Sequence, residues 1–210
     1  MPEGVVNYGA FLAAAFLFAV TPGLDTAFVL GKALGAGRRA ALITAFGINA
    51  GVLVHTVVGA LGLSALLAAS SEAFLAVKWA GALYLVWLGL NALFSKAQPF
   101  GALGGAGRES AWTSFRSGLI ANVLNPKVAL FVLAFFPQFI TDEAQGRPLP
   151  FILLGLSYAG VGLLWYLCFA WCAGSLGGCL KTHPAFGRIS GRLSGVVFIL
   201  LGLRMALAER

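Results

Sequence analysis

The chain has 210 residues, of which 60% are hydrophobic and 10% are charged, with a mean hydropathy of +0.91 and a formal net charge of +7. This composition is far too apolar for a water-soluble domain and indicates an integral membrane protein. The basic residues are spread over several links between apolar runs, without a single patch or an interleaved aromatic platform, so the net charge does not indicate nucleic-acid binding.

Six apolar segments follow one another along the chain, at about 9–30, 41–68, 73–94, 115–138, 150–179 and 188–208. Each is long enough to cross a hydrocarbon core of about 30 Å as a helix, and none alternates as a transmembrane β-strand does. We therefore predict one all-α transmembrane domain over residues 1–210, with six helices in the lipid bilayer. The first, third and fifth links hold more basic residues than the others, which favours both termini outside the cytoplasm.

The first segment contains an interruption in "FLFAVTPGLDTAFVL". Thr21 is a favoured N-cap residue, and Pro22 suits the first position of a helix because its missing N–H would be unpaired there anyway. Gly23 would allow a ligand to approach the backbone closely. Asp25 adds a charge at membrane depth, where ionisable residues are costly and mark functional sites. The pattern predicts a new helix N-terminus inside the membrane.

The second segment carries polar residues on a glycine-rich stretch. Gly47, Gly51, His55 and Gly59 recur every four residues. An imidazole can change its charge near physiological pH, so His55 is a candidate for proton coupling, but the same spacing is typical of a close-packed helix face with His55 hydrogen-bonded inside it. Asn49 lies near the same depth as the interruption, and we favour interhelical hydrogen bonding as its role.

The fourth segment has a second interruption, in "IANVLNPKVALFVL". Asn125 is again a favoured N-cap residue and Pro126 the next position. Lys127 supplies a charge opposite to that of Asp25. Asn122 precedes the break and, like Asn49, is expected to hydrogen-bond between helices.

The two interruptions suggest an internal repeat. Pro22 and Pro126 each lie in the first helix of a block of three, about 1–104 and about 105–210. Because three is an odd number, the second block enters the membrane upside down relative to the first. We predict two inverted three-helix repeats, with helices one and four interrupted at these prolines.

Two interpretations of the charges follow. A helix N-terminus offers unpaired N–H groups and about half a positive charge, which suits a carboxylate. Asp25 would then attract a substrate ammonium, while Lys127 and the two helix ends hold its carboxylate. In the alternative interpretation, Asp25 and Lys127 form a salt bridge that only neutralises two buried charges.

Four stretches together resemble the LysE-type amino-acid exporters, in particular their homoserine and threonine exporter branch. They are "TPGLDTAFVL", "GRRAALITAFGINAGVLVH", "KWAGALYLVWLGLNAL" and "NPKVALFVLAFFPQF". The resemblance implies a multi-pass permease of the bacterial inner membrane that expels neutral L-amino acids or derivatives, driven by protons. The family usually has Pro-Gly-Pro in the first motif. Leu24 replaces the second proline here, which leaves Pro22 to start the half-helix.

Other functions remain as alternatives. An exporter of basic amino acids, or a permease or channel for metal ions or small solutes, fits the same fold class, although a metal site would need clustered ligands that Cys168 and Cys172 do not complete. The sequence contains neither a nucleophile with a nearby base nor an H-E-x-x-H motif, so we do not expect an enzyme. It also lacks a P-loop, so we expect neither ATP nor another cofactor. A homo-oligomer is compatible with a small bundle, but no dimer face is evident.

Overall fold

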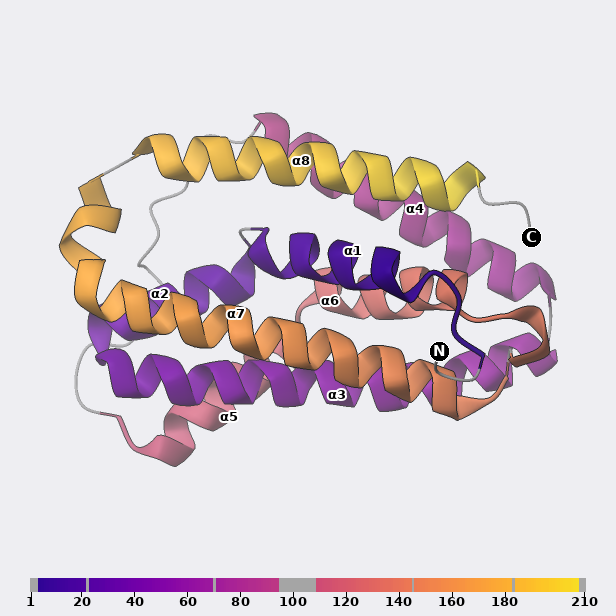
Figure 1. Ribbon diagram of the computed structural model, residues 1–210, viewed down its shortest axis with the longest axis horizontal. Helices are drawn as coiled ribbons and strands as arrows, with labels where there is room; N and C mark the ends of the chain where they lie inside the picture. Colours follow the sequence, from indigo (N-terminus) through magenta and orange to yellow (C-terminus); the bar gives the residue numbers. More distant parts are fainter. Residues whose placement is uncertain are drawn as a thin grey trace.

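The computed structural model describes residues 4–21, 23–69, 71–94, 109–144, 146–182 and 184–207. All regular elements within these ranges are helical, apart from a single antiparallel bridge between Val5 and Ile140 (Figure 1). The predicted all-α class is therefore confirmed for the described part of the chain.

Both predicted interruptions are breaks between helices. The first segment consists of α1 (Tyr8–Val20) and α2 (Leu24–Gly35), which are bent by 49° relative to each other. The fourth consists of α5 (Ala111–Val123) and α6 (Pro126–Leu130), with a bend of 54° between α5 and the stretch from Pro126 to Phe139.

The helical path after α6 is irregular. A π-helical turn, η1 (Phe131–Phe135), leads into a 3₁₀ turn, η2 (Phe136–Phe139). Pro137 lies in the second of these turns. Because proline has no N–H and its ring crowds the preceding turn, a regular α-helix cannot continue through this position. The remaining elements are α3 (Arg38–Ala69), α4 (Ser71–Phe94), η3 (Asp142–Ala144), α7 (Pro148–Thr182) and α8 (Pro184–Leu207).

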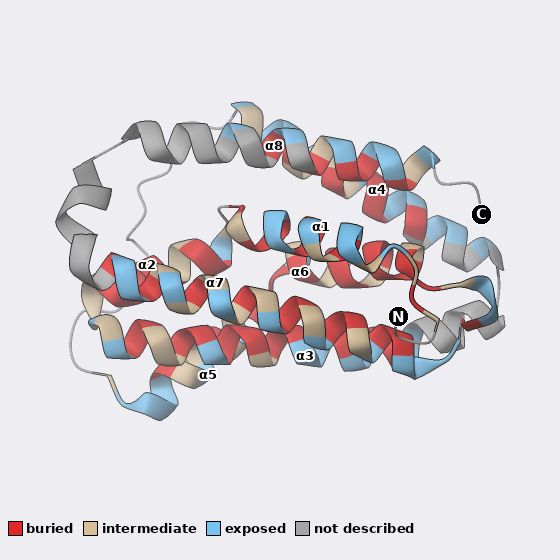
Figure 2. Cartoon of the chain, viewed as in Figure 1, coloured by how far each residue is buried: buried red, intermediate tan, exposed pale blue. Residues whose placement is uncertain are grey.

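Two helices in the described part, α3 and α7, are long and apolar enough to cross a membrane, and the number rises to four if each bent pair counts as one span. The element positions agree with the six predicted segments, but the arrangement as six spans in two inverted repeats stays a prediction. Large apolar side chains such as Leu61, Leu164 and Leu200 are exposed on the outer faces, as expected of a surface that contacts lipid (Figure 2).

Parts of the two broken segments, α1 and α6, lie between two layers of helices (Figure 1). α3 packs against α5 and α7, and α4 packs along α8, while α1 contacts α7 (Figure 1). A cluster of buried aromatic rings from α1, η1 and η2 fills the space between these layers, and its tightest pair is Phe18 stacked on Phe131, with centroids 3.8 Å apart. The breaks are thereby held inside the bundle.

Candidate functional site

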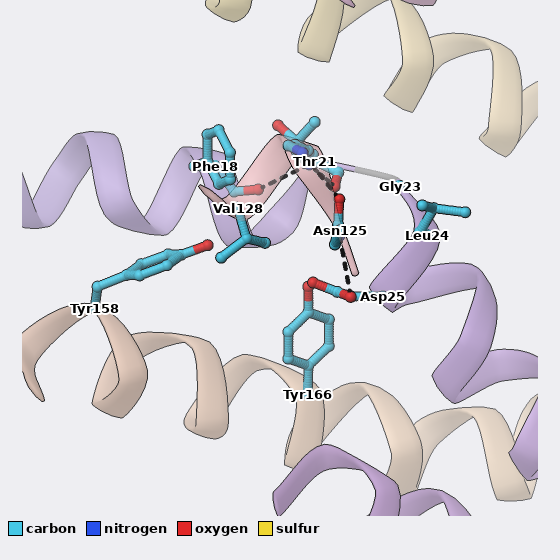
Figure 3. A pocket seen from close by; sticks show the side chains of 10 residues that line it. Phe18, Thr21, Gly23, Leu24, Asp25, Asn125, Val128, Tyr158 and Tyr166 are labelled. Carbon is cyan, nitrogen blue, oxygen red and sulfur yellow. Dashed lines mark hydrogen bonds between the residues drawn. The ribbon is translucent and has the colours of Figure 1, made fainter. Parts of the chain in front are cut away.

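The two breaks lie against each other (Figure 3). Asn125, at the second break, donates its side-chain N–H to Asp25 Oδ1 over 3.2 Å. Lys127 Nζ donates to the backbone carbonyl of Thr21, also over 3.2 Å. Residues of both breaks line one pocket together with residues of α7. The structure thus brings together most of the residues that the sequence singled out, and Pro22 lies outside the described residues.

The second break has the local structure that the sequence predicts. Asn125 is the N-cap of α6, and its side chain accepts a hydrogen bond from the Lys127 backbone N–H over 3.1 Å. Pro126 occupies the first helical turn, where its missing N–H costs nothing. This break therefore presents a capped helix N-terminus to the pocket.

The first break differs from the prediction. Thr21 is the C-cap of α1, not an N-cap, because both its backbone N–H and its hydroxyl bond to the carbonyl of Leu17, over 3.0 and 2.6 Å. α2 begins only at Leu24, with Gly23 as its N-cap. The expectation that Pro22 starts the half-helix falls on a residue outside the described ranges. A threonine hydroxyl can satisfy either helix end, and here it serves the preceding helix.

Gly23 has an extended backbone, with φ of −165°, that any residue can adopt. What distinguishes Gly23 is that it has no side chain next to Lys127. A Cβ atom added at Gly23 would lie 3.2 Å from Lys127 Nζ. The glycine therefore leaves room around the ammonium group of Lys127.

Asp25 is buried in the first turn of α2, where the positive end of the helix dipole favours an anion. Asn122 Nδ2 donates to its Oδ2 over 2.9 Å, and Asn125 donates to its Oδ1. Two neutral amides from the second broken segment therefore hold this carboxylate. Asn122 thereby makes the interhelical hydrogen bond that we expected.

Lys127 is half-buried and faces the C-terminal end of α1. Its Nζ lies 3.2 Å from the Thr21 carbonyl and 3.5 Å from the Phe18 carbonyl, and it sits over the rings of Phe18 and Phe198 at 4.5 and 4.9 Å from their centroids. Carbonyls at a helix C-terminus and aromatic faces both favour a cation. The lysine is thus stabilised without a carboxylate partner.

Among the described residues, no ion pair joins Asp25 to Lys127. Each charge is stabilised by polar groups on its own side of the pocket. The pocket has a volume of about 10 Å³, which is room for roughly one water molecule. In this conformation the space between the breaks is too small for an amino acid.

His55 and Asn49 lie on α3 beside the site. His55 Nε2 is 3.0 Å from the carbonyl of Asn122, and Gly51 on the same face approaches the Asn122 side chain closely. Asn49 donates within its own helix, to the Ala45 carbonyl over 2.8 Å, so the interhelical bond expected for it is not formed. Its Oδ1 is buried without a hydrogen-bond partner.

Sequence reasoning missed five pocket residues. They are Phe18, Leu24, Val128, Tyr158 and Tyr166. The two tyrosines are eight residues apart on α7, an apolar helix, and no local sequence signal distinguishes them from tyrosines at a membrane interface. Within the described residues, no group of three His, Cys, Asp or Glu side chains is placed to hold a metal ion.

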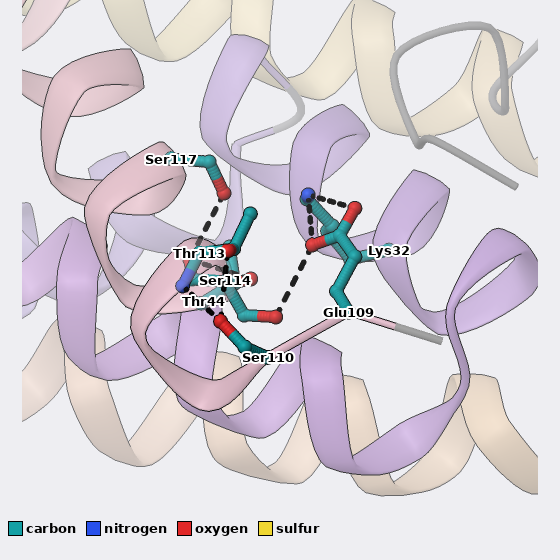
Figure 4. Close-up of polar contacts among 7 residues, drawn as sticks. All are labelled: Lys32, Thr44, Glu109, Ser110, Thr113, Ser114 and Ser117. Atoms are coloured by element: carbon teal, nitrogen blue, oxygen red, sulfur yellow. Dashed lines mark hydrogen bonds and ion pairs between the residues drawn. The ribbon is translucent and has the colours of Figure 1, made fainter. Parts of the chain in front are cut away.

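A second cluster of charges lies further along α2 (Figure 4). Lys32 is buried, and its Nζ lies 2.7 and 2.6 Å from the two carboxylate oxygens of Glu109. Ser114 Oγ also donates to Glu109, over 3.2 Å. Lys32 lies in the last turn of α2, so the ion pair joins α2 to the start of α5.

Comparison with known proteins gives the family. The model of the LysE type translocators matches residues 16–209. An uncharacterised membrane protein of Vibrio cholerae is 31% identical over 95% of this chain and 96% of its own length. Leucine efflux proteins of an Enterobacter species and of Klebsiella pneumoniae are 28% and 29% identical, each over 97% of this chain and 96% of its own length. No solved structure matches the chain significantly. Because the family model covers nearly all of the sequence, the chain belongs to the LysE type translocator family.

Proposed function

We propose that this protein is a secondary transporter that exports neutral L-amino acids from the bacterial cytoplasm across the inner membrane. The similarity to two leucine efflux proteins supports an amino-acid substrate. Phe18, Leu24 and Val128 line the pocket beside its polar residues, and such apolar groups suit a side chain such as that of leucine, as well as the homoserine or threonine type that the sequence favours.

One observation carries the proposal. Asp25 and Lys127 carry opposite charges at two facing helix breaks, line the same pocket, and make no direct ion pair with each other. An amino acid zwitterion carries a matching pair of charged groups, an ammonium and a carboxylate, both bonded to its α-carbon. We propose that its ammonium binds beside Asp25 and its carboxylate beside Lys127, with Gly23, Thr21, Asn125 and the end of α6 forming the surrounding backbone.

Transport requires the site to open on each side in turn. We propose that the two blocks of three helices, about 1–104 and about 105–210, form inverted repeats that rock around the breaks at Pro22 and Pro126. Glycines support this motion, since Gly47 and Gly118 bring the backbones of α3 and α5 into close contact. Such an interface can slide without rebuilding bulky side chains.

We propose the proton gradient as the energy source, because the sequence has no nucleotide-binding motif. His55 is one candidate for the coupling group, on account of its contact with Asn122, which in turn holds Asp25. The alternative role, packing within the glycine-lined face of α3, is equally consistent with that contact.

Counterflow in liposomes tests the function. The purified protein is reconstituted with unlabelled internal amino acid, and uptake of labelled leucine, threonine, homoserine, lysine and arginine is followed with and without a pH gradient. We expect uptake of the neutral amino acids, stimulated by the gradient. Preferential uptake of lysine or arginine would make this a basic amino-acid exporter, and uptake of none would overturn the proposal.

A further inference from the structure

We propose that Tyr158 and Tyr166 of α7 bind the transported amino acid through their hydroxyl groups. This inference rests on the proposed function and assigns further ligands to the same site. It makes α7 the third wall of the site, beside the two broken segments.

Both tyrosines line the pocket. They are eight residues apart, about 80° past two full helical turns, so they lie on the same half of the α7 surface but point in different directions. In Figure 3 the Tyr166 hydroxyl points toward Asp25, and the Tyr158 hydroxyl points toward Val128. The two groups therefore enter the pocket at different places.

Neither hydroxyl group makes a well-formed hydrogen bond to the described part of the protein. Tyr158 and Tyr166 are only 5% and 7% exposed, yet no hydrogen bond within the described residues joins either hydroxyl to a protein group. Tyr166 lies close enough to Thr26 for their hydroxyl groups to interact, but the contact is not a well-formed hydrogen bond, and the Thr26 hydroxyl is buried without another partner. By contrast, the Tyr8 hydroxyl is 2.7 Å from Ser157 Oγ.

A buried tyrosine hydroxyl normally finds a partner, and an unsatisfied one is destabilising. Packing alone gives no reason for these hydroxyls, since phenylalanine would fill the same space. The ring of Tyr158 already packs against Phe131 and Phe136, with centroids 5.1 and 6.1 Å away. The unused hydroxyls therefore point to a ligand.

A zwitterion needs more hydrogen bonds than the two charged residues offer. Both oxygens of Asp25 already accept from asparagine amides, and Lys127 Nζ already donates to carbonyls. A tyrosine hydroxyl both donates and accepts. Tyr166 can thus accept from an ammonium that lies beside Asp25. Tyr158 and Lys127 both contact the ring of Phe18, so Tyr158 can donate to a carboxylate on the lysine side.

The test removes only the hydroxyl groups. Tyr158→Phe, Tyr166→Phe and the double variant are compared with the wild type in the counterflow assay, with labelled leucine as the probe. Tyr84→Phe, on α4 and stacked on Trp87 outside the pocket, is the matched control. We expect the KM to rise about 10-fold for each single variant, because hydrogen bonds to charged groups are strong, while the control keeps the wild-type KM. Melting temperatures in detergent should stay the same or rise.

A second readout separates ligand binding from packing. Unlabelled leucine and leucine methyl ester are compared as competitors of labelled leucine. Removal of the Tyr158 hydroxyl should reduce the preference for the free acid over the ester, whereas a purely structural effect would weaken both competitors equally.

The outcomes distinguish the two proposals. If the wild type exchanges leucine but both phenylalanine variants keep its KM and its preference for the free acid, the tyrosine proposal is overturned and the exporter stands. If the wild type exchanges no amino acid, the proposed function fails, and the assignment of these ligands fails with it.

Discussion

Two pairs of opposite charges lie on α2 and its neighbours, and they are built differently. Lys32 and Glu109 touch, with nitrogen–oxygen distances of 2.6 and 2.7 Å. Asp25 and Lys127 line one pocket without an ion pair between them. An ion pair whose only role is to join two helices stabilises the fold most when its two charged groups are in direct contact. Asp25 and Lys127 at the breaks make no such contact. Neutral amides hold the charge of Asp25, and backbone carbonyls hold the charge of Lys127.

The difference separates the two interpretations that the sequence left open. A salt bridge that only neutralised Asp25 and Lys127 would resemble the contact between Lys32 and Glu109 (Figure 4). In the observed arrangement, the Asp25 carboxylate and the Lys127 ammonium line one pocket without a direct ion pair between them. That geometry suits a ligand with both charges.

Loss of one charge at the breaks should have the largest effect. Asp25→Asn and Lys127→Met should each lower the initial rate of leucine counterflow at least 30-fold, because loss of a desolvated charged contact costs about 2–5 kcal/mol. Glu109→Gln, which removes a charge from the other pair, is the control. Retention of more than half the wild-type rate by either break variant would remove its residue from the binding site.

Loss of one charge from the direct pair should act on stability instead. Lys32→Met and Glu109→Gln should each destabilise the protein by roughly 1–3 kcal/mol, since one charge is left partly buried without its partner. The double variant Lys32→Glu with Glu109→Lys should recover most of this loss. Thermal unfolding in detergent measures the effect. A charge-swapped double variant that is no more stable than the single variants would mean that the pair's orientation matters, not its contact alone.

A methyl group at Gly23 should have a moderate effect. The backbone there accepts any residue, but the new Cβ atom would lie 3.2 Å from Lys127 Nζ. We expect Gly23→Ala to fold normally and to weaken leucine uptake several-fold by crowding the Lys127 ammonium, beside which we place the substrate carboxylate. Gly9→Ala, on α1 with no atom near the added Cβ, is the control and should behave as the wild type. Equal leucine uptake by Gly23→Ala and Gly9→Ala would contradict a role for the space around Lys127 Nζ.

The smallest effect is expected from His55→Asn. The His55 ring contacts only the Asn122 carbonyl among the hydrogen bonds described, so packing should largely survive the change. We expect uptake that still responds to the pH gradient, within about 2-fold of the wild type if one hydrogen bond of modest strength is lost. Loss of the gradient response, with counterflow intact, would instead assign proton coupling to His55.

The sequence predicted much of this arrangement because its strongest signals are local. The apolar runs set the positions of the helices, and Pro126 with Asn125 set the second break, including its cap. The first break was harder, because a threonine such as Thr21 can cap either the helix before it or the helix after it. Only the observed bond to Leu17 decides between them.

Partners that are distant in sequence could not be predicted. Lys32 and Glu109 are separated by 77 positions, and Asp25 and Asn122 by 97, so their contacts depend on how whole helices pack. The same limit applies to Tyr158 and Tyr166. A tyrosine that faces a pocket has the same local sequence signal as one at a membrane interface.

The most direct measurement is leucine counterflow by the double variant Asp25→Lys with Lys127→Asp, in protein shown to be folded by its melting temperature. If the two residues bind opposite ends of a zwitterion, each in surroundings fitted to its own charge, the double variant should transport no better than Asp25→Asn alone. Transport near the wild-type rate would show that the two charges only need to balance each other, and would contradict the binding site described here.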